Sequence, residues 1–145
     1  MSTNTSRFVL GLALAASFAV ILPALAESVS FKADVNASSQ VPPNNSKGKG
    51  TVTATYDTAS KKFSWKGSYS GLTGDATAAH FHGPAEAGTN AGVAVPIANP
   101  ASPFEGSAVL TDAQAADLMA GKWYVNVHTA ANKGGEIRGQ VVKGK

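Results

Sequence analysis

Segments in which apolar and polar residues alternate follow one another along most of this chain. "VSFKADV" places Val29, Phe31, Ala33 and Val35 on one face, and "GTVTATYD" alternates in the same way. A period of two is typical of a β-strand with one buried face, and the glycines and prolines between the segments indicate turns at short intervals. The pattern therefore predicts antiparallel strands over residues 29–35, 50–57, 61–70, 76–82, 92–97, 104–110, 122–129 and 135–142.

One segment, "TDAQAADLMAG", breaks this alternation and has the signals of a helix. Thr111 and Gln114 have the spacing of a capping box, and Gly121 is a typical residue to end the helix. We expect one short helix near 112–120. About eight antiparallel strands with one short helix predict an all-β fold, either a Greek-key β-sandwich or a small barrel, and we favour the sandwich.

The first 26 residues have the layout of a secretory signal peptide. A polar start containing Arg7 precedes an apolar run from Phe8 to Leu22, and the segment ends in Ala24-Leu25-Ala26. We expect cleavage before Glu27, which leaves a single domain over 27–145 in the periplasm or the extracellular space. The mature chain has no second apolar run long enough to span a bilayer, so we expect it not to be membrane-spanning.

Composition narrows the chemistry of the mature chain. The sequence has no cysteine, which excludes disulfides, thiolate metal sites and cysteine nucleophiles. The 12 basic residues include Arg7, so the mature chain carries 11 basic and 9 acidic residues. Because the basic residues are scattered rather than gathered in a patch, we expect no nucleic-acid partner.

The chain has only three histidines, and all three lie near predicted strand ends. His80 and His82 flank Phe81 in "AAHFHGP", and His128 lies in "WYVNVHT". Residues i and i+2 of a strand project from the same face about 6–7 Å apart, so His80 and His82 point the same way while Phe81 points to the core. If the two strands are neighbours, the three imidazoles converge. Three imidazoles suit copper or zinc and leave a coordination position open.

Other catalytic patterns are missing or weak. The sequence has no G-x-S-x-G elbow, phosphate loop or dinucleotide fingerprint, and its acidic residues are spread singly. In "GGEIRGQV", Glu136 and Arg138 share a strand face. We favour a surface ion pair for these two residues. The functional alternative places Arg138 near the histidines, where it would attract a small anion.

The motifs "QVPP", "GLTGDATAAHFHGPAEAG" and "LMAGKWYVNVHTAANKGGEIRGQV" together resemble the CHRD domain, a module named after chordin that also occurs alone in exported bacterial proteins. The resemblance covers roughly Ser28 to Val142. It implies an immunoglobulin-like Greek-key sandwich similar to the copper/zinc superoxide dismutases. Those enzymes carry an H-x-H pair on one strand and another copper-binding histidine on a later strand.

By this resemblance His80, His82 and His128 are the metal ligands, and Arg138 corresponds to the arginine that guides superoxide. The chain has no further histidine for a bridging ligand and no disulfide. The resemblance therefore implies a copper-only, three-histidine site, with zinc as the alternative occupant.

Two functions follow as hypotheses. The first is an exported copper protein with superoxide dismutase-like chemistry, whose partner is a small anion such as superoxide. The second is a non-catalytic metal-binding or carrier protein, or a protein-interaction module as in chordin. A homodimer and a separate metal-donor protein stay open as partners, because the sequence carries no signal for or against either.

Overall fold

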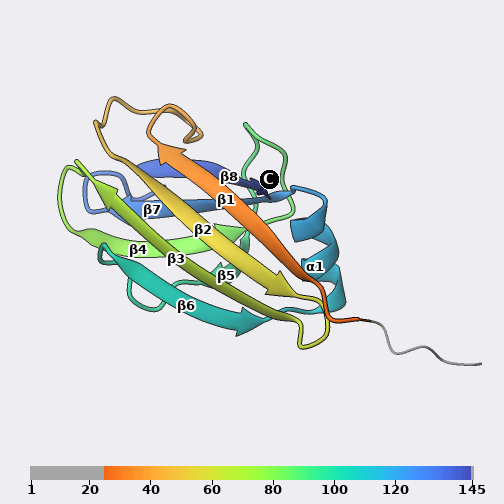
Figure 1. The fold of residues 1–145 in the computed structure, drawn as a ribbon. Helices are drawn as coiled ribbons and strands as arrows, with labels where there is room; N and C mark the ends of the chain where they lie inside the picture. The colour runs from red at the N-terminus through yellow and green to blue at the C-terminus, as the bar shows by residue number, and fades with distance from the viewer. Residues whose placement is uncertain (1–24, 145) are drawn as a thin grey trace, which may run out of the picture.

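The computed structural model describes residues 25–144, so the expected signal peptide over 1–26 lies almost entirely outside the described residues. The described part contains eight strands and one short helix, as expected (Figure 1). The strands are β1 (Ser28–Asn36), β2 (Lys49–Asp57), β3 (Lys62–Ser70), β4 (Ala76–His82), β5 (Val93–Pro96), β6 (Phe104–Val109), β7 (Trp123–Thr129) and β8 (Ile137–Lys143).

All the strand pairings are antiparallel, and they link the strands in the order β5-β4-β7-β8-β1-β2-β3-β6. The sheet curls into a nearly closed barrel or sandwich (Figure 1). Several neighbours are joined directly along the chain, but β7 returns to lie beside β4, and β6 lies beside β3. Such returning connections are Greek-key connections. The predicted fold class is confirmed.

The alternating residues of the strands meet in one apolar core. Phe31, Ala33 and Val35 of β1 are buried, while Lys32 and Asp34 between them are exposed. The centre of the core is aromatic. The ring of Phe81 lies edge-on to Phe63 and Trp65, with centroids 5.1 and 5.2 Å apart. These contacts fix the inward face of β4 and leave its histidines on the opposite face.

The helix α1 (Asp112–Met119) begins and ends as its sequence predicts. The Thr111 hydroxyl accepts from the backbone N–H of Gln114, and the Gln114 side chain accepts from the N–H of Thr111, which completes the capping box. Gly121, just past the end, has φ of +74°, a conformation that glycine adopts without strain. Gln114 also donates to the Ala94 carbonyl, which ties the helix to β5.

Most predicted strand ends coincide with those of the structure or differ by one residue, and one boundary differs by two. The last strand begins at Ile137 rather than at residue 135. Gly135 adopts φ of +122° and donates to the Asn132 carbonyl, so it belongs to the turn between β7 and β8. None of the helical segments within residues 25–144 has the length and apolar character needed to cross a membrane.

Candidate metal centre

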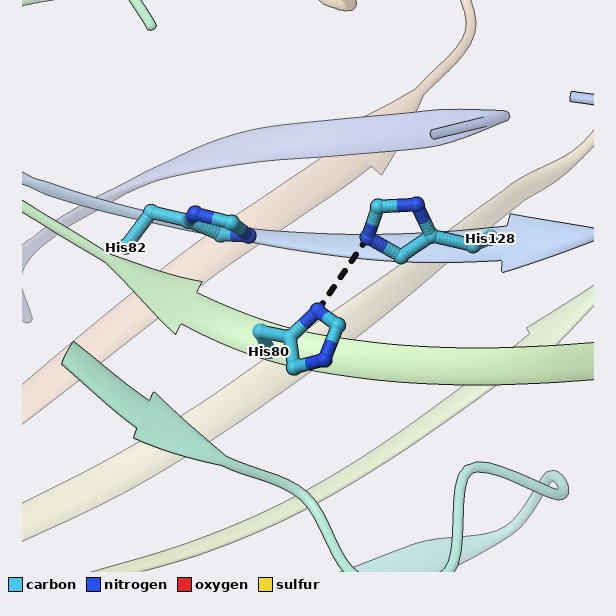
Figure 2. A group of neighbouring side chains, drawn as sticks. All are labelled: His80, His82 and His128. Carbon is cyan, nitrogen blue, oxygen red and sulfur yellow. Dashed lines mark hydrogen bonds between the residues drawn. The ribbon is translucent and has the colours of Figure 1, made fainter. Parts of the chain in front are cut away.

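The three histidines come together on two neighbouring strands. β4 pairs with β7 so that His80 lies opposite Asn126, His82 opposite Tyr124, and Ala78 opposite His128. His128 is therefore the diagonal neighbour of His80 on the same face of the sheet. Figure 2 shows the three rings gathered over these strands. The predicted convergence is confirmed, and its condition, that the two strands be neighbours, is met.

The nitrogen atoms are close enough to share one ion. One ring nitrogen from each histidine can be chosen so that all three lie within 4.8 Å of one another. His80 Nδ1 lies 3.2 Å from His128 Nε2, the contact drawn as a dashed line in Figure 2. Two ligands bound tetrahedrally at about 2.0–2.1 Å from a zinc ion lie about 3.3–3.4 Å apart, close to the separation of His80 Nδ1 and His128 Nε2. The cluster could therefore hold a metal ion.

Hydrogen bonds to backbone carbonyls determine which ring nitrogen carries the proton in two of the three histidines. His82 Nδ1 lies 3.0 Å from the Ala91 carbonyl oxygen, and His128 Nδ1 lies 2.8 Å from the Lys133 carbonyl oxygen. Because a carbonyl oxygen only accepts, both Nδ1 atoms carry the proton, and in a neutral ring the Nε2 lone pair is then free. Both Nε2 atoms face the cluster. This pattern of a carbonyl behind a ligating histidine is common in metal sites.

Burial favours the neutral rings that a metal requires. Desolvation lowers the pKa of His80, and the charges of His128 and His82 lower it further. Desolvation also lowers the pKa of His82, against a rise from its hydrogen bonds to Ala91 and Asn126. A neutral imidazole has a lone pair to donate, so both shifts favour metal binding over protonation.

Asn126 lies at the centre of the cluster, and the sequence analysis did not identify it as a site residue. Its Oδ1 is 3.0 Å from His82 Nε2 and 3.0 Å from His128 Nε2, and the residue is only 2% exposed. The alternation that places Tyr124, Asn126 and His128 on one strand face is the sequence pattern that could have identified Asn126 as a neighbour of the histidines. With the protons of both rings on Nδ1, the two Nε2 atoms only accept, so the Asn126 amide holds the rings at a fixed spacing when its NH₂ group, rather than Oδ1, is turned toward them.

Arg138 lies behind this cluster rather than at its opening. The ring of Tyr124 stacks on His82 with centroids 4.7 Å apart, and the Arg138 guanidinium lies 3.5 Å from the Tyr124 centroid. The guanidinium donates to Asn90 Oδ1 and to the Thr89 carbonyl. Arg138 is 1% exposed. It therefore secures the loop over 83–92, whose Ala91 carbonyl orients His82.

The predicted surface ion pair between Glu136 and Arg138 is wrong. Both residues are buried, and in the described part of the chain the ion pairs join Lys32 to Asp34 and Lys61 to Asp112. Alternation along a strand does not reveal that loops cover this face. The Glu136 carboxylate instead accepts five hydrogen bonds, from Ser46 Oγ, Thr73 N, Thr73 Oγ1, Thr129 Oγ1 and Asn132 Nδ2.

His80 and His128 border an open pocket of about 450 Å³. Its walls carry small side chains and one charged residue, Lys133. His82 is not part of the wall, in agreement with its 8% exposure. A small molecule in solution can thus approach the cluster from the side of His80 and His128. The pocket is lined by Thr77, Ala78, His80, His128, Thr129, Ala130 and Lys133.

The chain that forms this sheet and the histidine cluster matches a known protein family. The family model of the CHRD domain matches residues 31–141, from β1 to β8, and this span includes all three histidines. No curated protein and no solved structure matches this chain at a significant level. The family match covers most of the chain and agrees with the motifs that carry the resemblance. The chain therefore belongs to the CHRD domain family.

Proposed function

We propose that this CHRD protein is an exported copper-binding protein with a mononuclear site formed by His80, His82 and His128. The observation that carries the proposal is the orientation of the rings. Two Nδ1 atoms donate to backbone carbonyls, His128 Nε2 lies 3.2 Å from His80 Nδ1, and the Nε2 atoms of His82 and His128 both lie 3.0 Å from Asn126 Oδ1. Lone pairs that converge in this way repel each other unless a proton or a metal ion lies among them. Neutral imidazoles are good ligands for copper and zinc.

Copper is the favoured occupant, with zinc as the alternative. Divalent copper binds a given set of nitrogen ligands more tightly than divalent zinc does. With three protein ligands a position stays open on the side of the pocket, as in catalytic rather than structural metal sites. The resemblance to the copper/zinc dismutases, with an H-x-H pair and a late histidine, supports the same ligand set.

The chemistry that fits the site is superoxide dismutation. Bound copper would supply a one-electron couple, by which one superoxide is oxidised to O₂ and a second, with two protons, is reduced to H₂O₂. The residues of the chain have other tasks. The Ala91 and Lys133 carbonyls keep two ligands in the correct tautomer, and the pocket beside His80 and His128 admits a small anion. Arg138 acts from behind Tyr124, through the loop that it secures.

A non-catalytic role is the second candidate: metal carriage, or protein interaction as in chordin. A fold does not by itself imply an activity. The burial of Arg138 favours this candidate, because the arginine expected to guide an anion is not on the pocket wall. The two candidates share the metal site and differ in turnover.

Metal analysis and a superoxide assay separate these candidates. The exported protein is loaded with Cu(II), and bound copper is counted and examined by EPR. We expect one copper per chain with nitrogen hyperfine coupling, and loss of tight binding in His80→Ala, His82→Ala and His128→Ala. Asn45→Ala, at an exposed position, is the control. Absence of stoichiometric copper and zinc would refute the metal site. Tight copper with superoxide removal no faster than that of free copper would favour the carrier.

Export is part of the proposal and has its own test. The intact mass of the protein recovered from the periplasm or the medium should correspond to a chain beginning at Glu27. A mass that includes residues 1–26 would contradict it.

A further inference from the structure

We propose that Lys133 is the residue that draws small anions into the pocket beside His80 and His128. This inference rests on the proposed copper site and deepens it by naming a residue that determines its ligand class. Seven residues line the pocket, and Lys133 is the charged one among them. The other lining side chains are alanines, threonines and the two histidines, so they provide no opposing charge.

The position of Lys133 is fixed from its backbone. The Lys133 carbonyl accepts the hydrogen bond from His128 Nδ1 at 2.8 Å, so the residue is tied directly to a metal ligand. The turn that carries it is closed by backbone hydrogen bonds between Thr129 and Asn132 and by the hydrogen bond from Gly135 to Asn132. Glu136 accepts from the side chains of Thr129 and Asn132 and holds the two ends of the turn.

The side chain of Lys133, in contrast, extends into solvent and is not held by an ion pair in the described part of the chain. Lys133 is exposed and forms no ion pair within residues 25–144. The nearest acidic residue along the chain, Glu136, is 0% exposed, and its two oxygens accept five hydrogen bonds from groups other than Lys133. An unpaired cation at the mouth of a pocket raises the local concentration of anions.

Arg138 cannot take this role, although the sequence suggested it. Its guanidinium is buried, is committed to Thr89 and Asn90, and borders a different hollow of about 220 Å³ that contains none of the three histidines. The site therefore separates two tasks. Arg138 holds a loop inside the protein, and Lys133 presents positive charge to solvent.

The ligand class that follows is a small monovalent anion, which a single positive charge attracts and a pocket walled by short side chains admits. Azide is a suitable probe, because it binds Cu(II) and its charge-transfer absorption reports occupancy without any turnover. Wild type, Lys133→Gln, Lys133→Glu and Lys133→Arg are loaded with copper, and the copper content and EPR spectrum of each are recorded first. Azide is then titrated at low and at high ionic strength.

At low ionic strength we expect Lys133→Gln to bind azide about threefold more weakly and Lys133→Glu about tenfold more weakly than wild type, from the Coulomb energy of one and two charge units across several ångströms of water. Lys133→Arg should match wild type, and the differences should shrink at high salt because exposed charges are screened. Lys66→Glu is the control. It changes the net charge of the protein by the same amount as Lys133→Glu does. Lys66, however, lies on β3 and lines another hollow.

Two results overturn the inference, and they differ from failure of the copper site. Normal copper binding with unchanged azide affinity in Lys133→Glu would show that Lys133 does not attract the anion. An equal loss in Lys66→Glu would show that only net charge matters. If wild type binds no metal at all, both the copper site and the role of Lys133 are refuted together.

Discussion

At the scale of single residues, the geometry of the histidine cluster depends on groups other than the three imidazoles. Asn126 contacts two ring nitrogens at 3.0 Å each, and two carbonyls hold the opposite sides of those rings. Groups of this kind orient the ligands and adjust how tightly they bind a metal. The three histidines are thus held at their spacing by their surroundings as well as by the two strands.

Replacing Asn126 tests this spacing. We expect Asn126→Leu to weaken copper binding by about tenfold, since loss of a residue that orients ligands typically costs 10–100-fold in metal affinity. Competition with a chelator of known affinity measures the change. The control is Asn45→Leu, which makes the same substitution at an exposed position. Equal copper affinity in Asn126→Leu and wild type would contradict a positioning role for Asn126.

At the scale of elements, the loop over 83–92 is part of the site. Arg138 holds it through Thr89 and Asn90, and the Tyr124 hydroxyl is hydrogen-bonded to both the N–H and the carbonyl of Ala91. The same carbonyl accepts from His82. The order of the loop and the orientation of one ligand are therefore linked.

Arg138→Gln should loosen this loop. The expected result is faster amide hydrogen exchange within 83–92 and lower copper affinity, with little change in exchange at β1, β2 and β3. Mass spectrometry of exchanged peptides measures it. Lys143→Gln, at an exposed position of the same strand, is the control. If Arg138 instead guides anions, its loss would leave the loop unchanged and alter azide binding in a salt-dependent way.

The helix offers a separate test of element stability. Thr111→Ala removes the hydroxyl that accepts from Gln114 and should lower the free energy of unfolding by about 1 kcal/mol. Urea denaturation followed by circular dichroism measures this value. Because α1 is tied to β5 rather than to the strands that carry the histidines, copper affinity should not change. A loss of copper binding would contradict that separation.

At the scale of the whole molecule, one buried carboxylate joins segments distant in sequence. Glu136 binds Ser46 from the β1–β2 connection, Thr73 from the β3–β4 connection, and Thr129 at the end of β7. Desolvation alone would raise the pKa of Glu136, but the hydrogen bonds from Ser46, Thr129 and Thr73 outweigh it and lower the pKa to about 2. One side chain thus ties three loops at the same end of the sheet.

This low pKa has a consequence for acid stability. A carboxylate whose pKa is lower in the folded than in the unfolded chain stabilises the fold above the unfolded value, near 4.5, and this contribution disappears as the pH falls toward about 2. Glu136→Gln should be less stable than wild type at pH 7, and the difference should narrow below pH 4.5. Urea unfolding at several pH values measures it, with the exposed Glu105→Gln as control. A constant difference across this range would contradict the assignment.

The sequence predicted local structure well and long-range contacts only in part. Alternation located all eight strands, and the capping residues located α1, because these signals depend on neighbours in the chain. His80 and His82 could be placed on one face for the same reason. The roles of Asn126, Lys133 and Glu136 could not be predicted, since they depend on which strands pair and which loops cover them. The buried pair Glu136 and Arg138 looked like a surface pair because a period of two does not tell which face is covered.

The pairing of β4 with β7 has a consequence beyond this protein. All three histidines come from one two-stranded ladder: two are separated by a single residue on one strand, and the third is diagonal on its neighbour. No loop has to supply a ligand. Such a motif can be transferred, in that any antiparallel pair with a free polar face and the same register can receive the three substitutions. A protein engineer would need only to add acceptors behind the rings.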